Sequence, residues 1–257
     1  MSNRVLLKQW KLILIKENKF EKNATKEHSS RTINFLSDKI PDKLEETLNS
    51  AFIKAFELIF EKGTNVIEKT YSKQSIQQNH QVNNFAFSVY NDQKRLNAIN
   101  HKATKTTFYS TVFSGVKGVG LGILGIGLPD IPIFIGTIFR GIYEIALQYG
   151  CDYNTEEEKY FILNIISTSL SHGKAAIEAN RELNNFMANP QLPYGYSRST
   201  EVEKVSNVLS QELLYLKFVQ GLPIIGAAGG VFDAKFTNQI LGYAKLKYKR
   251  RYLLNKI

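Results

Sequence analysis

The chain has 257 residues, with 33 lysines and arginines against 23 aspartates and glutamates, which gives a net charge of +10 at pH 7. This length suits one domain with a core of roughly 200 residues, and the charge favours an anionic partner, either nucleic acid or the acidic inner leaflet of a membrane. A single cysteine, Cys151, excludes an internal disulfide and any cysteine-rich metal site, and it indicates a reducing compartment.

Residues 1–22 predict a basic amphipathic helix. Their longest uncharged apolar run, residues 12–15, is too short for the core of a signal peptide, so we expect no secretion. Such a helix either lies on a membrane surface with Trp10 at the interface or packs on the core as a first helix. Glu17 and Glu21, which follow soon after, favour the packed arrangement.

A helix is predicted from Pro41 to about Gly63. Proline is tolerated at a first helical position, and the acidic residues that follow it complement the positive end of the helix dipole. Apolar residues then recur at helical spacing on one face. That face consists of Leu44, Leu48, Ala51, Phe52, Ala55, Phe56 and Ile59.

Residues 61–90 are predicted to form a variable insert, because the chain becomes polar and rich in Gln and Asn from Thr70 to Asn84. Residues 91–109 regain helical spacing and carry a basic face that directly precedes the most unusual part of the chain.

That part lies between Lys117 and Arg140, where Asp130 is the one charged residue. About twenty apolar residues are enough for a transmembrane helix, but closely spaced glycines and two prolines around Asp130 argue against a continuous one. The segment instead predicts two short helices that meet at a turn.

A second segment uses the same Gly-Leu-Pro break, and both contain glycines four residues apart, which let helix backbones approach closely. We therefore predict an all-α helical bundle with two glycine-rich apolar hairpins, at about 112–149 and 213–245, that pack on each other. The residues assigned to them are Gly118, Gly122, Pro129, Asp130, Pro132, Arg140, Pro223, Gly226 and Gly230.

The remaining elements have clear signals at their ends. Asn154 or Thr155 is predicted to cap a helix with an acidic first turn, residues 189–199 form a loop, and a long helix follows at about 200–220. The final helix becomes basic near its end. Four of its cations are expected to contact anionic lipid: Lys245, Lys249, Arg250 and Arg251.

These elements predict a single domain over residues 1–257. Its core is expected at about 30–60 and 91–254, with the insert at 61–90 and the basic helix at 1–22.

An ordered set of motifs resembles the bacterial EcsC family over about 140 to 150 residues. The set comprises Leu128-Pro129-Asp130-Ile131-Pro132, then Tyr149-Gly150-Cys151-Asp152 with residues 156–163, then Leu222-Pro223 through Gly226 and Gly230, and last Ala244, Tyr248, Arg251 and Leu253. The sequence departs from the family pattern at Cys151, where an aromatic residue is usual, and near Asp233.

The resemblance implies a membrane-associated helical protein. The family is named for genes beside an ABC transporter that affects secretion, its own activity is not established, and some members have been labelled hydrolase or peptidase.

The chain shows no catalytic motif with a supporting context. Its four histidines have no zinc-binding spacing, and two Ser-x-x-Lys matches lack the other elements of penicillin-recognising enzymes. Cys151 is expected to pack inertly, because Asp152 beside it would raise the pKa of the thiol. We predict no cofactor and no metal site.

Four acidic residues are the catalytic candidates: Asp130, Glu144, Asp152 and Asp233. Asp130 stands at the amino end of a helix, where capping is the simplest role, and Arg140 and Glu144 are one helical turn apart. The alternative is that the carboxylates converge in a cleft and act in hydrolysis or bind a divalent cation. The sequence alone does not show convergence.

Three functions follow from these patterns. The first is a membrane-associated accessory or scaffold on the inner face of the bacterial cell membrane, with anionic lipid and an ABC transporter or another membrane protein as partners. The second is a membrane-associated, peptidase-like hydrolase that uses the acidic residues. The third, and the least favoured, is nucleic-acid binding by the basic final helix with Tyr243, Tyr248 and Tyr252 as stacking residues.

Overall fold

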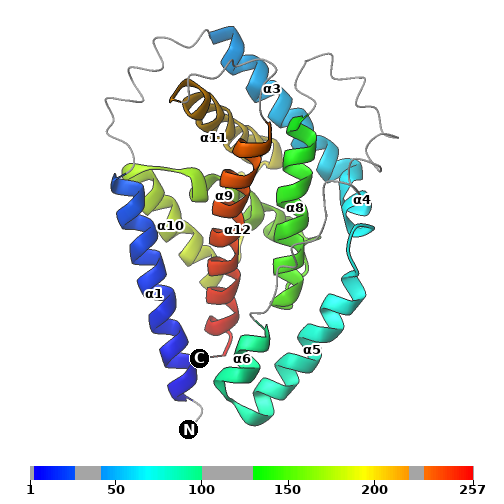
Figure 1. The fold of residues 1–257 in the computed structure, drawn as a ribbon, viewed down its shortest axis with the longest axis vertical. Helices are drawn as coiled ribbons and strands as arrows, with labels where there is room; N and C mark the ends of the chain where they lie inside the picture. The colour runs from blue at the N-terminus through cyan, green and yellow to red at the C-terminus, as the bar shows by residue number, and fades with distance from the viewer. Residues whose placement is uncertain (1–2, 27–41, 100–129, 220–228, 257) are drawn as a thin grey trace.

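The computed structural model describes residues 3–26, 42–99, 130–219 and 229–256, and all regular structure in these four ranges is helical. This confirms the predicted all-α bundle (Figure 1). The elements are α1 (Asn3–Lys26), α3 (Asp42–Leu58), the π-turn η1 (Ile59–Gly63), α4 (Thr64–Glu68), α5 (Lys73–Tyr90), α6 (Gln93–Ile99), α8 (Asp130–Gln148), α9 (Glu156–Leu170), α10 (Gly173–Ala188), α11 (Arg198–Val219) and α12 (Gly229–Leu254).

Helix α8 lies at the centre of the core. It packs against α3, α5 and α12, and its Phe139 ring makes edge-to-face contacts with Phe56, Phe60 and Tyr143. Residues Ile131–Gln148 are long and apolar enough to cross a membrane, but 78% of that window is buried inside the bundle. The central helix of any helical core has the same composition, so burial in the bundle accounts for the apolarity of α8.

Helices α8 and α12 run side by side (Figure 1). A Cβ atom added to Gly141 would come within 2.6 Å of the Leu241 side chain, so the missing side chain lets the two helices approach closely. The parts of the two predicted hairpins that the structure describes therefore pack on each other, as expected. Pro132 and Arg140 lie in α8, and Gly230 lies in the first turn of α12.

The turns of the hairpins stay predictions. Gly118, Gly122, Pro129, Pro223 and Gly226 lie outside the described residues, as does the side chain of Asp130.

Several predicted elements appear with the expected signals. Thr155, and not Asn154, caps α9, since its hydroxyl accepts a hydrogen bond from the Glu158 N–H at 3.2 Å. Helix α11 matches the long helix predicted at 200–220. The helix predicted to run to Gly63 is α3 up to Leu58 and continues as η1, whose π-helical pattern includes the hydrogen bond from the Thr64 N–H to the Ile59 carbonyl oxygen.

The segment predicted as an insert contains η1, α4 and α5, and two contacts attach α5 to the rest of the bundle. His80 Nδ1 donates to the Gln148 carbonyl oxygen at 2.7 Å, and Tyr252 donates from its hydroxyl to Asn84 Oδ1 at 2.8 Å. The variability of residues 61–90 stays a prediction.

Gly150 makes the first of these contacts possible. It follows α8 with φ +77°, and a Cβ atom there would lie 2.4 Å from His80 Nε2. Gly150→Ala is expected to destabilise the protein by about 2 kcal/mol, through a left-handed backbone conformation and displacement of the histidine. Because the clash needs the ring, the same change in a His80→Ala background should cost only about 1 kcal/mol. Urea denaturation of the four proteins measures both values, and equal costs in the two backgrounds would contradict the contact.

Candidate functional site

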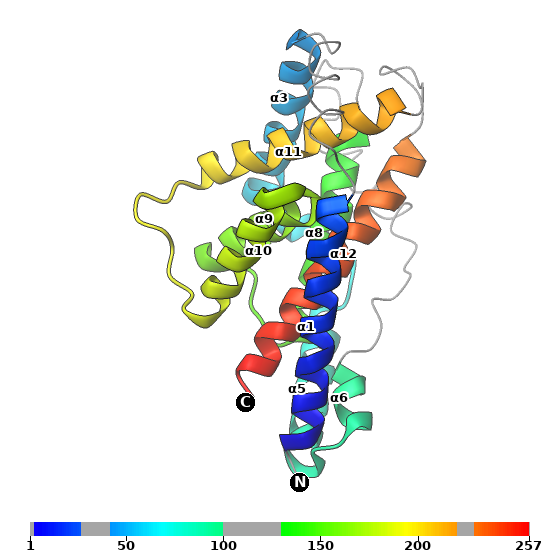
Figure 2. The same cartoon turned by 90° about the vertical axis from the view of Figure 1, so that its left-hand side faces the viewer.

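Helix α1 packs against α10 and α12 along one face, while the opposite face is open to solvent (Figure 2). Both carboxylates of α1 point inward. Glu17 accepts hydrogen bonds from Lys247 Nζ and from Arg250 Nη1, each at 2.6 Å, and Glu21 accepts one from Asn180 Nδ2 at 2.8 Å. The helix is therefore packed on the core, as its glutamates predicted.

The outer face of α1 has a distinctive composition as a result. All its exposed charged residues are cations: Arg4, Lys8, Lys11, Lys16, Lys19 and Lys22. Four large aliphatic side chains are exposed among them, namely Leu7, Leu12, Leu14 and Ile15, and Ile15 is 62% exposed. We call this the α1 outer face.

Lys247 anchors α12 beneath that helix. It is fully buried, and its ammonium group donates to Glu17 Oε1, to Asn184 Oδ1 at 2.8 Å and to Asn180 Oδ1. Burial lowers the pKa of Lys247 to about 8, so it stays protonated at neutral pH and uses all three of its protons. Tyr243 donates to the same Asn180 oxygen at 2.8 Å.

Arg251 and Arg250 are committed to glutamates as well. Arg251 forms a bidentate pair with Glu158 at 2.8 and 2.9 Å, and Arg250 pairs with Glu17 while stacking over Trp10. The prediction that these two arginines contact lipid is untested. We build the candidate site from the other two predicted cations, Lys245 and Lys249.

A cavity of about 880 Å³ lies between α1 and α12 and is lined by four lysines: Lys16 and Lys19 of α1, and Lys245 and Lys249 of α12. We call it the lysine cavity. No aspartate or glutamate is among its lining residues, and no salt bridge to these four lysines occurs in the described part of the chain. Its other polar lining includes Asn23, Asn97, Ser169, Asn238 and Gln239.

Lys249 is the most constrained of the four. Its Nζ donates to Gln9 Oε1 at 2.6 Å. Burial lowers the pKa of Lys249 to about 8, and the neighbouring ammonium groups of Lys16 and Lys245 lower it further in the same direction. The cavity therefore holds positive charge that no carboxylate balances among the residues described.

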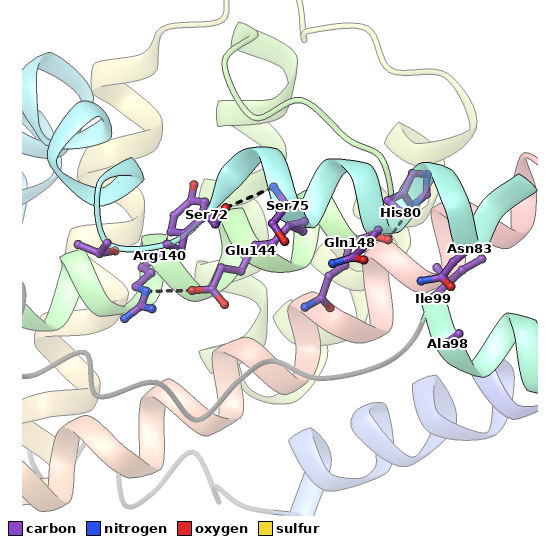
Figure 3. Close-up of a pocket in the computed structure, with 13 residues that line it drawn as sticks. Ser72, Ser75, His80, Asn83, Ala98, Ile99, Arg140, Glu144 and Gln148 are labelled. Carbon is purple, nitrogen blue, oxygen red and sulfur yellow. Dashed lines mark hydrogen bonds and ion pairs between the residues drawn. The ribbon is translucent and has the colours of Figure 1, made fainter.

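A second cavity, of about 530 Å³, lies between α5, α6 and α8 (Figure 3). Arg140 Nε donates to Glu144 Oε1 at 2.9 Å in its wall, so these two residues, one helical turn apart, form a buried ion pair. Figure 3 shows this pair on α8, with Ser72, the N-cap residue of α5, and Ser75 of α5 also lining the cavity. Burial raises the pKa of Glu144, against the opposing effect of Arg140.

The structure places the four acidic candidates as follows. Glu144 lines the second cavity, whereas Asp152 does not and instead accepts hydrogen bonds from the backbone and side chain of Asn154 at 3.1 and 2.7 Å. The side chains of Asp130 and Asp233 lie outside the described residues. In the described part of the chain, no group of three His, Cys, Asp or Glu residues is arranged to hold a metal ion.

The pKa of the Cys151 thiol is raised, which is the expected direction, but Asp152 is not the cause. Burial is the main cause, and the charged neighbours that act on the thiol are Arg251, which lowers its pKa, and Glu158, which raises it. The expected effect of Asp152 is not among them.

Sequence reasoning found Lys245 and Lys249 but missed Lys16 and Lys19 as their partners. The signal available was helical spacing: Lys16 and Lys19 are three residues apart, and Lys245 and Lys249 are four apart, so each pair shares one helix face. That these two faces meet is a tertiary fact.

A model of the EcsC protein family matches residues 7–253. The chain belongs to the EcsC family. The match runs from α1 to the end of α12, so both walls of the lysine cavity lie within the EcsC region. A search of curated proteins found no match, and neither did a search of solved structures.

The buried anchor of this EcsC protein gives a stability prediction. Lys247→Met leaves Asn180 and Asn184 without their shared donor and removes one partner of Glu17, so we expect a loss of about 3 kcal/mol. Lys11→Met on the α1 outer face removes the same charge and should change stability by no more than about 0.5 kcal/mol. Urea denaturation compares the two, and equal losses would contradict an anchoring role.

The lysine cavity gives a pH prediction. The pKa of Lys249 is below that of an unfolded lysine, about 10.4, so the unfolded chain binds more protons between pH 8 and 10 and this lysine makes folding more favourable as pH rises through that window. NMR of ¹³C-labelled lysine should show two resonances with a pKa near 8, from Lys247 and Lys249, and the Lys249→Gln variant should lose one of them. A value near 10.4 would mean that the cavity is well solvated.

Proposed function

We propose that this EcsC protein binds the anionic face of a membrane peripherally, through the α1 outer face. The observation that carries the proposal is the inward orientation of Glu17 and Glu21, which leaves exposed cations and aliphatic side chains with no exposed carboxylate on that helix. Each cation near an anionic leaflet contributes about 1 kcal/mol, and each aliphatic side chain that enters the interface adds to this.

A second apolar patch lies on α5, across the bundle from α1 (Figures 1 and 2). Val82, Phe85 and Val89 of α5 are each more than half exposed. They lie towards the end of the molecule where α1 begins, and Gln9 of α1 donates to Gln93 of α6 at 3.0 Å there (Figures 1 and 2). An exposed apolar patch of this kind marks an interaction site, and this one is separate from the α1 outer face.

The cellular role that we propose is an accessory or scaffold at the inner face of the bacterial cell membrane. The family's association with an ABC transporter supports a transporter as the protein partner.

The alternative is a hydrolase that uses Glu144. Its support is the polar cavity around the Arg140–Glu144 pair and the raised pKa of Glu144, which suits a general acid or base. Nucleic-acid binding has no comparable support, because Tyr243, Tyr248 and Tyr252 are at most 6% exposed and present no face for base stacking.

Flotation with liposomes tests the proposal. The full chain is expected to float with anionic vesicles at low salt, to float poorly with neutral vesicles, and to lose much of its binding at about 0.5 M salt. Ile15→Ser should weaken binding several-fold because it removes an exposed aliphatic side chain from the α1 outer face. Ile177→Ser, on the exposed side of α10, is the matched control and should not.

Two results would overturn this function. One is absence of binding to anionic vesicles at low salt. The other is binding that survives high salt and is unaffected by Ile15→Ser, which would move the contact from α1 to the predicted apolar hairpins.

A further inference from the structure

The lysine cavity has a charge arrangement that a bundle does not need for its own stability. Lys16 and Lys19 face it from α1, and Lys245 and Lys249 face it from α12, so two basic helix faces oppose each other across a space of about 880 Å³. Like charges that face each other destabilise a fold unless a counter-charge lies between them. The counter-charge here does not come from a carboxylate of the described chain.

The rest of the lining suits an anion. Amide and hydroxyl side chains surround the lysines, and Gln239 is fixed by its hydrogen bond to the Ser169 carbonyl oxygen at 2.7 Å. Tyr149 and Tyr243 provide an aromatic floor. A divalent cation would meet four ammonium groups and no carboxylate, so the chemistry of the lining selects against it.

The cations of the cavity are compatible with a phosphate group. Arg250 and Arg251 nearby are both used on carboxylates of the protein, Glu17 and Glu158. The four lysines are compact point charges, each with three protons, and together they can meet the several oxygens of a tetrahedral phosphate. The volume of the cavity is in the range of pockets for ligands larger than a bare phosphate ion.

We propose that the lysine cavity binds an exposed phosphate group, and that its ligand is the phosphate of an anionic lipid headgroup. The lipid source rests on the proposed membrane contact of α1, because Lys16 and Lys19 belong both to the cavity and to the α1 outer face. That the ligand is an anion rests on the cavity alone.

The first experiment uses inorganic phosphate as a soluble probe, titrated into the full chain by calorimetry against chloride at matched ionic strength. Lys249→Gln should raise the dissociation constant about tenfold, since it removes one charge-assisted contact. Lys11→Gln removes the same charge from α1 outside the cavity and should raise it no more than about twofold. Equal effects in the two variants would mean screening by net charge and would overturn the site.

The second experiment separates the possible sources of the phosphate. Vesicles that carry phosphatidic acid are compared with vesicles given equal surface charge by a fatty acid, whose headgroup is a carboxylate. The protein should bind phosphatidic acid vesicles more tightly, and Lys249→Gln should abolish that preference, whereas Lys174→Gln, at an exposed position of α10 outside both surfaces, should keep it.

The outcomes distinguish this inference from the proposed function. If Lys249→Gln loses inorganic phosphate but keeps the lipid preference, a lipid headgroup is not the ligand and a free phosphate compound is. If Lys249→Gln changes neither, the cavity inference is wrong, whereas the α1 contact still stands or falls with Ile15→Ser.

Discussion

The α1 side of the molecule depends on the contact between Glu17 and Lys247. A buried carboxylate and a buried ammonium group are costly to remove from water, and here the cost is offset by a closed set of partners: Glu17 also holds Arg250, and Lys247 also holds Asn180 and Asn184. The contact ties α1 to α12 and, through the two asparagines, to α10. It also fixes the rotation of α1 about its own axis, and with it the direction of every other side chain on that helix.

That rotation produces both features on which the functional argument rests. With Glu17 and Glu21 turned inward, the outer face of α1 is left with cations and aliphatic residues, and Lys16 and Lys19 are brought opposite Lys245 and Lys249. The buried Glu17–Lys247 pair therefore determines which side chains are exposed on the α1 outer face, although neither residue lies on that face.

Much of the fold was predictable because its signals are local. Helical spacing identified α3, an acidic first turn located the start of α9, and proline and glycine marked the loop before α11. The family was also identified correctly, and the family match covers nearly the whole chain. Local signals could not show which helix faces meet. The contact that joins α1 to α12 links Glu17 and Lys247, which are 230 positions apart.

The basic end of α12 shows the same limit for the site. The sequence presents Lys245, Lys249, Arg250 and Arg251 as one cationic cluster, but successive helical residues point about 100° apart. In the structure the two arginines pair with glutamates, and the two lysines line a cavity. The spacing of Lys245 and Lys249 could have separated the pairs, whereas the buried partners could not have been named without the fold.

The anchoring of α1 has a consequence for how the protein would meet a bilayer. Amphipathic segments that are disordered in solution pay for their ordering when they bind, but α1 is already helical and its axis is held by α10 and α12. The protein would bind as a rigid body, with the axis of α1 in the plane of the membrane. Binding would need no folding step. Its orientation on the surface would then be set before contact, and so would the side of the bundle that faces away from the membrane.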